Sequence, residues 1–474
     1  MSGITSIGAY VPIYRLSSEE ISKTWGGRSG PGSKAVAGYD EDTITMAVAA
    51  TLDCLKRHSG PVGGLSLATT TSPYLEKQSA ALIASVVDLP RECHTADYTD
   101  SLRAATSALR SAANAVDSGA SENVIVTASD CRLGATQGSL EQLLGDGAAA
   151  LMIGSQNVIA AIEGSYSIFS DFTDFWRTSE DAYIRSAEGR FIEDNSYLPV
   201  MQEAIKGLLA KCKLGPKDIA RAVFYAPDAR LHAGLARRLG LDKTQVQDTL
   251  YSQIGNTGTA ATLIMLIAAL AGAKPGDRIL LASYGDGSDA FLFRVTDGIS
   301  KFRNQPGLIE GKAKKMAIGY GKYLTWKGLV PVEVSTLPER SPMSLMTRWR
   351  ERRVISSLYG VRCKKCGTAQ ISPIGQAVRV CVNCQAKDQF EDYKFSDKKG
   401  KIFTFATDQL QATLNPPGVN GVIDFDDGGR LICELTDYEL DKVKVGMPVE
   451  MTFRKMYTNR GIINYFWKAK PVAG

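Results

Sequence analysis

Four cysteines near the C-terminus have the spacing of a metal site. Cys363 and Cys366 form one Cys-x-x-Cys pair, and Cys381 and Cys384 form a second pair fourteen residues later. Each pair places two thiolates on one turn, and two pairs complete a closed tetrahedral site of four sulfur ligands, which favours zinc. We therefore expect a structural Zn²⁺ with no chemistry at the metal. A redox pair is the alternative that this spacing disfavours.

A second candidate site lies where a strand ends and a helix begins, in HTADYTDSLRAATSALRSAANAVDSGASENVIVTASD, from His94 to Asp130. The helix is rich in small residues, so other elements can approach it closely and we expect its N-terminus to be buried. Such a terminus offers free amide donors and the positive end of the helix dipole, which suits an anion or an activated nucleophile. Leu102, which occupies the elbow, can be neither.

The histidines and two Gly-Asp-Gly turns add weaker candidates. The sequence has three histidines, of which His94 and His232 fall near strand-to-helix elbows and are candidates for proton transfer. A structural role is the preferred interpretation of both. Asp146 and Asp286, in the two turns, are expected to cap backbone turns.

An internal repeat indicates the elements that position these residues. The segment ENVIVTASD, ending at Asp130, matches DRILLASYGDGSDAFLFRV, and each copy follows a helix of small or apolar residues. Aligning Ser129 with Ser283 carries Leu102 onto Asn256, at the mouth of the matching helix. The repeat predicts a duplicated α/β unit, with the site where strand ends and the central helices of the two halves meet.

A different module begins near Met346. SLMTRWRERRVISSLYG predicts a basic amphipathic helix, and short strands with turn signals after the cysteines predict a small β-barrel. From Met346 onward, 21 Lys and Arg against 14 Asp and Glu give a net charge of +7, which leaves −2 for the rest of the +5 chain. This basic excess suits a phosphate-bearing ligand or a nucleic acid, and a solvated surface is the plain alternative.

Length and composition bound the class of protein. The chain has 474 residues, of which 44% are hydrophobic, enough for two or three domains with sizeable cores. Five of the nine cysteines are scattered without regular spacing, which argues against a disulfide framework. The first residues do not read as a signal peptide, and the longest apolar helix candidate, Ala260 to Ala273, is too short for a membrane span. We expect a cytoplasmic protein with no membrane contact.

Several segments together resemble a known family. Residues 1 to about 330 resemble archaeal-type 3-hydroxy-3-methylglutaryl-CoA synthases of the thiolase superfamily. The matching segments are ITSIGAYVPIYRLSSEEI, TSPYLEKQSAALIASVV, IGNTGTAATL, AKPGDRILLASYG and SDAF. Residues from about 346 onward resemble the zinc-ribbon and OB-fold proteins that accompany such enzymes, through CKKCGTAQISP, CVNC, GKIFTFA and GMPVEMTFRK. The resemblance implies a duplicated thiolase-like fold, layered α-β-α-β-α, then a zinc ribbon and a small OB-type barrel.

The resemblance also implies a catalytic cysteine, glutamate and histidine, but this sequence has other residues at all three positions. The cysteine position falls on Leu102, the glutamate position on Thr70 and the histidine position on Tyr225, while Asn256 of the GNT motif is retained. A register slip of one residue would offer Ser101 as a hydroxyl nucleophile. Thr70, Ser101 and His232 are therefore secondary candidates, and an acyl-enzyme through the family cysteine is not expected.

Four functions are compatible with this pattern. The first is non-covalent aldol or retro-aldol chemistry on a β-hydroxyacyl-CoA, with Tyr225 as general acid/base at the β-oxygen and Asn256 and backbone amides at the thioester oxygen. The second is a condensing enzyme or acyltransferase that works with a thiolase partner. The third is a non-catalytic CoA-binding scaffold. Nucleic-acid binding by the OB module is the fourth and least favoured.

The predicted domains follow the composition. They are a thiolase-like N-terminal half (1–162), a thiolase-like C-terminal half (163–297), an extension and linker (298–345), a basic helix with the zinc ribbon (346–388) and an OB-fold (389–474). The resemblance implies a homodimer that binds an acyl-CoA substrate, with coenzyme A as part of that substrate.

Overall fold

The chain divides into two compact units. The computed structural model describes residues 2–26, 29–30, 32–300, 315–333, 343–372 and 374–472. The first unit contains Asp42–Ala84, Leu89–Tyr320 and the chain before Tyr39, and the second contains the chain from Gly321 together with Tyr39–Glu41 and Ser85–Asp88. None of the helices in the described part of the chain has the length and apolar run that a membrane crossing needs.

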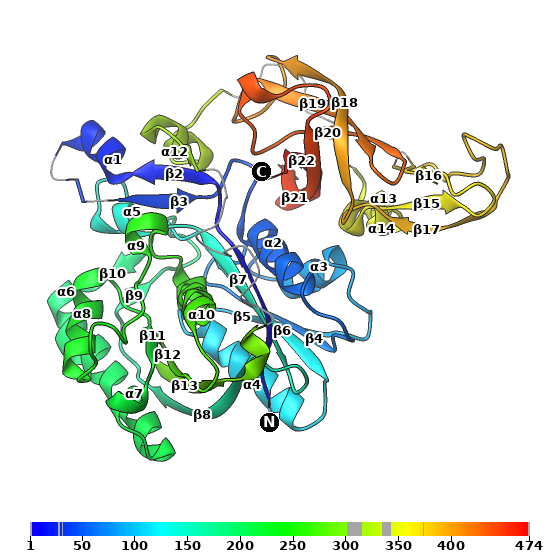
Figure 1. Ribbon diagram of the computed structural model, residues 1–474. Coiled ribbons are helices and arrows are strands. Elements are labelled where there is room, and N and C mark those ends of the chain that lie inside the picture. Colours follow the sequence, from blue (N-terminus) through cyan, green and yellow to red (C-terminus); the bar gives the residue numbers. More distant parts are fainter. Residues whose placement is uncertain are drawn as a thin grey trace. The chain divides into compact units, whose positions relative to one another are not determined.

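One nine-stranded sheet forms the centre of the first unit, with the order β11-β12-β13-β8-β1-β7-β6-β4-β5 (Figure 1). Strands β6 and β7 are buried along their whole length, as apolar strands covered on both faces should be. The strands are β1 (Gly3–Tyr10), β4 (Gly64–Ala68), β5 (His94–Tyr98), β6 (Asn123–Asp130), β7 (Gly147–Gly154), β8 (Ala160–Phe169), β11 (Arg221–Phe224), β12 (Arg278–Tyr284) and β13 (Gly287–Val295).

The two halves of this sheet repeat one pattern. In the first half β5, β4 and β6 are parallel and β7 and β1 are antiparallel. In the second half β11 and β12 are parallel, β13 and β8 are antiparallel, and a parallel bridge from Ala222 to Val246 takes the place of β5. Ser129 in β6 and Ser283 in β12 hold equivalent positions, so the structure has the predicted duplication.

Helices cover both faces of each half. The central helices α4 (Ala104–Asp117) and α10 (Ala261–Gly272) contact strands of both halves and share one core. Helix α2 (Thr43–Leu55) packs on β1, β6 and β7, and α7 (Leu198–Cys212) packs on β8, β12 and β13, which completes the predicted α-β-α-β-α layers. The unit also contains α1 (Ser18–Trp25), α3 (Ser79–Val86), α5 (Ser139–Leu143), α6 (Gly189–Ile192), α8 (Ala229–Arg238), α9 (Tyr251–Ile254), β2 (Tyr14–Ser17), β3 (Ser33–Val36), β9 (Phe175–Trp176), β10 (Arg185–Ser186) and β14 (Met316–Ala317).

The second unit contains two small sheets. Strands β16-β15-β17 form the sheet that carries the cysteine pairs, and β20-β19-β18-β21-β22 form the OB-fold sheet. In place of one basic helix, the structure has two, which meet at Glu351 (φ −92°, ψ 13°), although the Glu351 amide still donates to Thr347. The elements are α12 (Tyr320–Trp326), α13 (Leu345–Arg350), α14 (Arg352–Ser357), β15 (Tyr359–Cys363), β16 (Ala369–Gln370), β17 (Phe390–Lys394), β18 (Lys399–Asp408), β19 (Gly418–Phe425), β20 (Arg430–Glu434), β21 (Pro448–Asn459) and β22 (Ile462–Pro471).

A buried network of charges holds Tyr39–Glu41 in the second unit. Arg454 on β21 pairs with Glu41 and Asp437, and Lys468 on β22 pairs with Asp40 at 3.0 Å and Glu434 at 2.8 Å. Burial would lower the pKa of Lys468, but the neighbouring carboxylates raise it above its ordinary value, so the ammonium stays charged. Each buried charge therefore depends on its partner, because an unpaired ion in this interior is costly.

Replacing Lys468 with methionine should destabilise the second unit strongly. The change leaves Asp40 and Glu434 without their cation, and breaking a buried pair costs about 3–5 kcal/mol. Lys470→Met is the matched control, because Lys470 also lies on β22 and pairs with Glu450 of β21 in a part-exposed position, where a pair is worth about 0–1 kcal/mol. Urea unfolding of the full chain measures both, and equal midpoints would contradict the importance of the buried network.

Candidate active site

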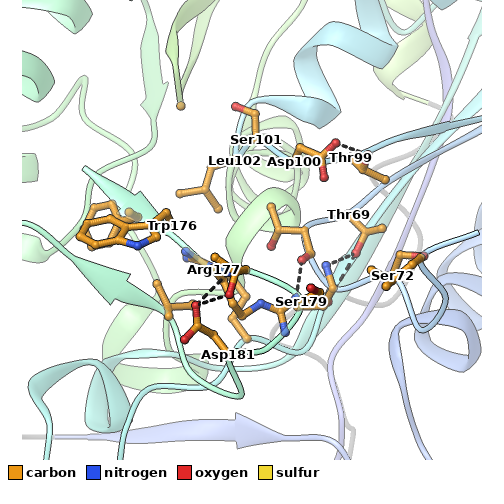
Figure 2. A pocket seen from close by; sticks show the side chains of 18 of the residues that line it. Thr69, Ser72, Thr99, Asp100, Ser101, Leu102, Trp176, Arg177, Ser179 and Asp181 are labelled. Carbon is orange, nitrogen blue, oxygen red and sulfur yellow. Dashed lines mark hydrogen bonds between the residues drawn. The ribbon is translucent and has the colours of Figure 1, made fainter. Parts of the chain in front are cut away.

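A cavity of about 850 Å³ lies at the carboxyl ends of the parallel strands in the first unit. Its walls come from the segments after β4, β5 and β6, from the loop around β9 and from the turn between β12 and β13. Figure 2 shows Ser101 and Leu102 on one side, with Trp176 and Arg177 opposite Leu102. Strand ends of this kind are the usual place for ligands in α/β proteins.

Leu102 stands at the beginning of α4 and lines the cavity. Its side chain is 7% exposed, and Arg103, the residue that caps the helix, gives no side-chain hydrogen bond to it. Gly285 faces this point, because a Cβ on Gly285 would lie 2.9 Å from the Leu102 amide nitrogen and 2.7 Å from Ser101 Oγ. The predicted elbow therefore exists, and Leu102 brings backbone amides rather than a nucleophile to the cavity.

Tyr225 and Asn256, two candidate site residues from separate segments of the second half, lie in contact. The Asn256 Nδ2 donates to the Tyr225 hydroxyl at 3.1 Å, and Asn256 Oδ1 accepts from the Gly258 amide at 3.1 Å, which fixes the side-chain amide. Arg132, which lines the cavity, also hydrogen bonds Tyr225. Tyr225 is 2% exposed and is not among the lining residues, so it reaches the cavity wall through Arg132.

The protonation state of Tyr225 suits a proton donor better than a proton acceptor. Burial raises the pKa of Tyr225 above its ordinary value, and the opposing effect of Arg132 is smaller. The phenol is therefore protonated at neutral pH. Because two donors already face its oxygen, the phenolate left after proton transfer would be stabilised.

The side-chain hydroxyl of Thr70 donates a hydrogen bond to a buried carboxylate. Asp130 Oδ1 accepts from the Thr70 amide at 2.7 Å and from Thr70 Oγ1 at 3.1 Å, and it also accepts from Thr69 and Thr71. Asp130 Oδ2 accepts from the Thr259 amide at 2.8 Å. This fully buried carboxylate ties together the segment after β4 and the start of the α10 region, so Thr70 lines the cavity in a fixed orientation.

His232 lies apart from the cavity. It is on α8, stacks on Phe224 with ring centroids 4.3 Å apart, and is 6% exposed. Burial lowers the pKa of His232 to about 4, so the ring is neutral. The structure does not bring it together with Tyr225 and Asn256 at the cavity wall, in keeping with the structural role preferred from the sequence.

The sequence analysis missed two groups that line the cavity, Arg132 and Asp174, and a buried tyrosine behind them, Tyr284. Arg132 follows β6, Asp174 precedes β9, and Tyr284 at the end of β12 hydrogen bonds Asp174. Asp174 is 7% exposed, and burial raises the pKa of its carboxyl. The polar ends of ASDCRL and LLASYGDG could have pointed to Arg132 and Tyr284, but Asp174 lies in an irregular loop with no periodic pattern.

The four predicted metal ligands in the second unit form one cluster. Their sulfur atoms all lie within 4.8 Å of one another, with Cys363 Sγ 3.6 Å from Cys384 Sγ and Cys366 Sγ 3.5 Å from Cys381 Sγ. A tetrahedral site with metal–sulfur bonds of about 2.3 Å has edges of about 3.8 Å. The four cysteines are therefore placed close enough together to hold one metal ion.

Family models match two parts of the chain. Residues 209–294 match the C-terminal domain of 3-oxoacyl-[acyl-carrier-protein] synthase III, and residues 393–454 match the C-terminal OB-fold domain of ChsH2. The first match runs from the end of α7 into β13, and the second runs from the end of β17 into β21 of the OB-fold sheet.

Curated relatives match most of the first unit. The chain is 34% identical over 339 residues to the hydroxymethylglutaryl-CoA synthase of Methanopyrus kandleri, covering 69% of this chain and 97% of that protein. It is 37% identical over 331 residues to the synthase of Pyrococcus horikoshii, covering 68% and 94%.

Solved structures show the same fold. A crystal structure of HMG-CoA synthase complexed with CoA matches with a TM-score of 0.63 at 19% identity, covering 72% of this chain and 95% of that one. The 3-oxoacyl-[acyl-carrier-protein] synthase III of Aquifex aeolicus VF5 matches with a TM-score of 0.55 at 22% identity, covering 62% and 100%. These likenesses establish the thiolase-type architecture of the first unit.

One metal ion per chain is expected at the cysteine cluster, and four thiolates favour zinc. Elemental analysis of freshly purified protein should give one equivalent of zinc, and the Cys363→Ser/Cys381→Ser double variant should give none. The scattered Cys93→Ala variant serves as the control and should keep its zinc. Zinc retained in the double variant would rule out this ligand set.

Proposed function

Because the chain belongs to the hydroxymethylglutaryl-CoA synthase family, we propose that it is a condensing enzyme that acts on CoA thioesters without an acyl-enzyme. The observation that carries this proposal is Leu102 at the buried beginning of α4, where the family pattern places the cysteine. Among the residues that line the cavity, none is a cysteine. In this proposal the enolate forms on the acyl-CoA thioester itself, with no acyl group transferred to the protein.

The reaction proposed is aldol addition, or its reverse, on a β-hydroxyacyl-CoA. An enolate of the thioester adds to a carbonyl carbon, so a donor must hold the thioester oxygen and an acid must protonate the new β-oxygen. Backbone amides at the start of α4 suit the first task. Tyr225 suits the second, with Asn256 orienting its hydroxyl and Arg132 stabilising negative charge beside it.

A condensing enzyme or acyltransferase that depends on a thiolase-family partner is the second candidate. The names of the relatives support a synthase more directly than an aldolase, and the match to the ChsH2 OB-fold domain supports an accessory module of the kind found beside such enzymes. In that case the partner would supply the acyl group that Leu102 cannot carry. A non-catalytic scaffold would bind CoA and show no turnover, with or without an added thiolase.

The assembly proposed is a homodimer through the thiolase-like unit, as the family resemblance implies. Light scattering at micromolar concentration should give twice the mass of the 51.1 kDa chain. A monomer at that concentration would remove this part of the proposal.

Incubation with acetyl-CoA should leave the protein without a covalent acyl group. Leu102 has no nucleophilic atom, so intact-protein mass spectrometry should show the unmodified chain, and thiol labelling should leave activity unchanged. Carbon–carbon bond chemistry should be found by screening acyl-CoA thioesters against small aldehydes and ketones. Turnover that appears only after a thiolase is added would favour the partner-dependent candidate.

Tyr225→Phe should abolish most of the carbon–carbon bond chemistry. Loss of a well-placed proton-transfer group costs roughly 100- to 10,000-fold in rate. Cys93→Ala and Cys131→Ala should leave the rate largely intact, since the proposed reaction uses no thiol. Full activity in Tyr225→Phe, or a dead cysteine variant, would exclude the non-covalent reaction.

A further inference from the structure

The proposed reaction needs a second proton-transfer group, at the carbon next to the thioester carbonyl. Tyr225 serves the β-oxygen, and a protonated phenol is a poor base for a C–H bond. The residue at the family's glutamate position is Thr70, which donates to Asp130. A carboxylate from another part of the chain is therefore required.

Five carboxylates line the cavity, and four of them are exposed, part-exposed or engaged. Asp97 accepts from the amides of Ser79 and Ala80 at the start of α3, and Asp181 pairs with Arg185. Asp100 and Asp286 are exposed to solvent. Asp174 is the remaining one, and it is buried at 7% exposure.

The position of Asp174 is fixed by its own backbone and by β12. The Phe175 amide donates to Asp174 Oδ1 at 2.6 Å, and the Ala187 amide donates to the Asp174 carbonyl at 2.8 Å. The Tyr284 hydroxyl donates to the Asp174 carboxylate and lies 2.7 Å from Ser196 Oγ. Among the described residues, no lysine, arginine or histidine forms an ion pair with Asp174.

The charged and titratable groups around Asp174 come from separate elements. Tyr284 ends β12, Tyr225 follows β11, Arg132 follows β6, and Asp286 lies in the turn after β12. Tyr284 leads directly into Gly285, which faces the Leu102 amide. Asp174 and Leu102, which carries the proposed amide donor, thus both line the cavity, and the proposed acid Tyr225 lies behind Arg132 in its wall.

We propose that Asp174 is the general base that takes the proton from the α-carbon of the acyl-CoA substrate. This inference rests on the proposed function. Because none of the described cations pairs with it, the Asp174 carboxylate stays available to accept a proton. Burial also raises the pKa of this carboxyl, which makes its carboxylate a stronger base.

The reaction balances with the groups present. In the condensing direction, the α-carbon C–H bond breaks, its proton goes to Asp174, and its electron pair becomes the thioester enolate. The enolate carbon forms a bond to the carbonyl carbon of the second substrate, whose oxygen takes the proton of Tyr225. Proton exchange with solvent then returns Asp174 and Tyr225 to their starting states. In the cleavage direction each transfer is reversed.

The test is exchange of the α-protons of acetyl-CoA with deuterium oxide, followed by mass spectrometry. This half-reaction needs no second substrate. Wild-type protein should incorporate deuterium, and Asp174→Asn should slow incorporation roughly 100- to 10,000-fold. Asp171→Asn, an exposed carboxylate on the same loop, should match wild type.

A second variant keeps the test independent of folding. Tyr284→Phe retains the carboxylate but removes a donor that lowers the Asp174 pKa, so the acidic limb of the exchange rate should move to higher pH. A purely structural Asp174 would not produce that shift.

The outcomes separate the two proposals. Unchanged exchange in Asp174→Asn would overturn the role of Asp174 and leave the proposed function standing. If exchange depends on Asp174 but no carbonyl compound undergoes carbon–carbon bond formation or cleavage, the proposed function would be overturned. The role of Asp174 as general base would be supported. If wild-type protein exchanges no α-proton of acetyl-CoA, the role of Asp174 as general base would be overturned as well.

Discussion

The packing of α4 and α10 between the two halves of one sheet is the constraint on which the candidate active site depends. Both helices contact strands of both halves, and α4 does so with a run of small buried side chains. The start of α4 places Leu102 against Gly285, while the segment before α10 places Asn256 against Tyr225. Larger side chains on α4 would separate these helix ends before touching any reacting group. The core therefore sets how Leu102, Asn256 and Tyr225 are placed, and the loop around β9 completes the cavity.

Much of the fold was predictable because its signals are local or repeat at a fixed offset. The cysteine pairs meet as their spacing requires, and the offset that aligns Ser129 with Ser283 corresponds to equivalent strands. The contact between Tyr225 and Asn256 agrees with their prediction as one site. The break in the basic helix at Glu351 was not predicted, since the surrounding residues all suit a helix.

The groups that the sequence did not reveal share a physical cause. Arg132 and Asp174 act on Tyr225 from segments far apart in the chain, and nothing in their local sequence records that meeting. The role of Thr70 was hidden for a similar reason, because Asp130 binds it from another strand. The guanidinium and the carboxylate near the predicted phenol therefore become visible only in three dimensions.

The buried charges that hold Tyr39–Glu41 bear on where the chain can be divided. Asp40 and Glu41 pair with Lys468 and Arg454 of the second unit, although most of that unit begins only at Gly321. A chain cut near Gly321 would leave Arg454 and Lys468 without two of their carboxylates. A truncation at this point would therefore divide the buried charge network of the second unit.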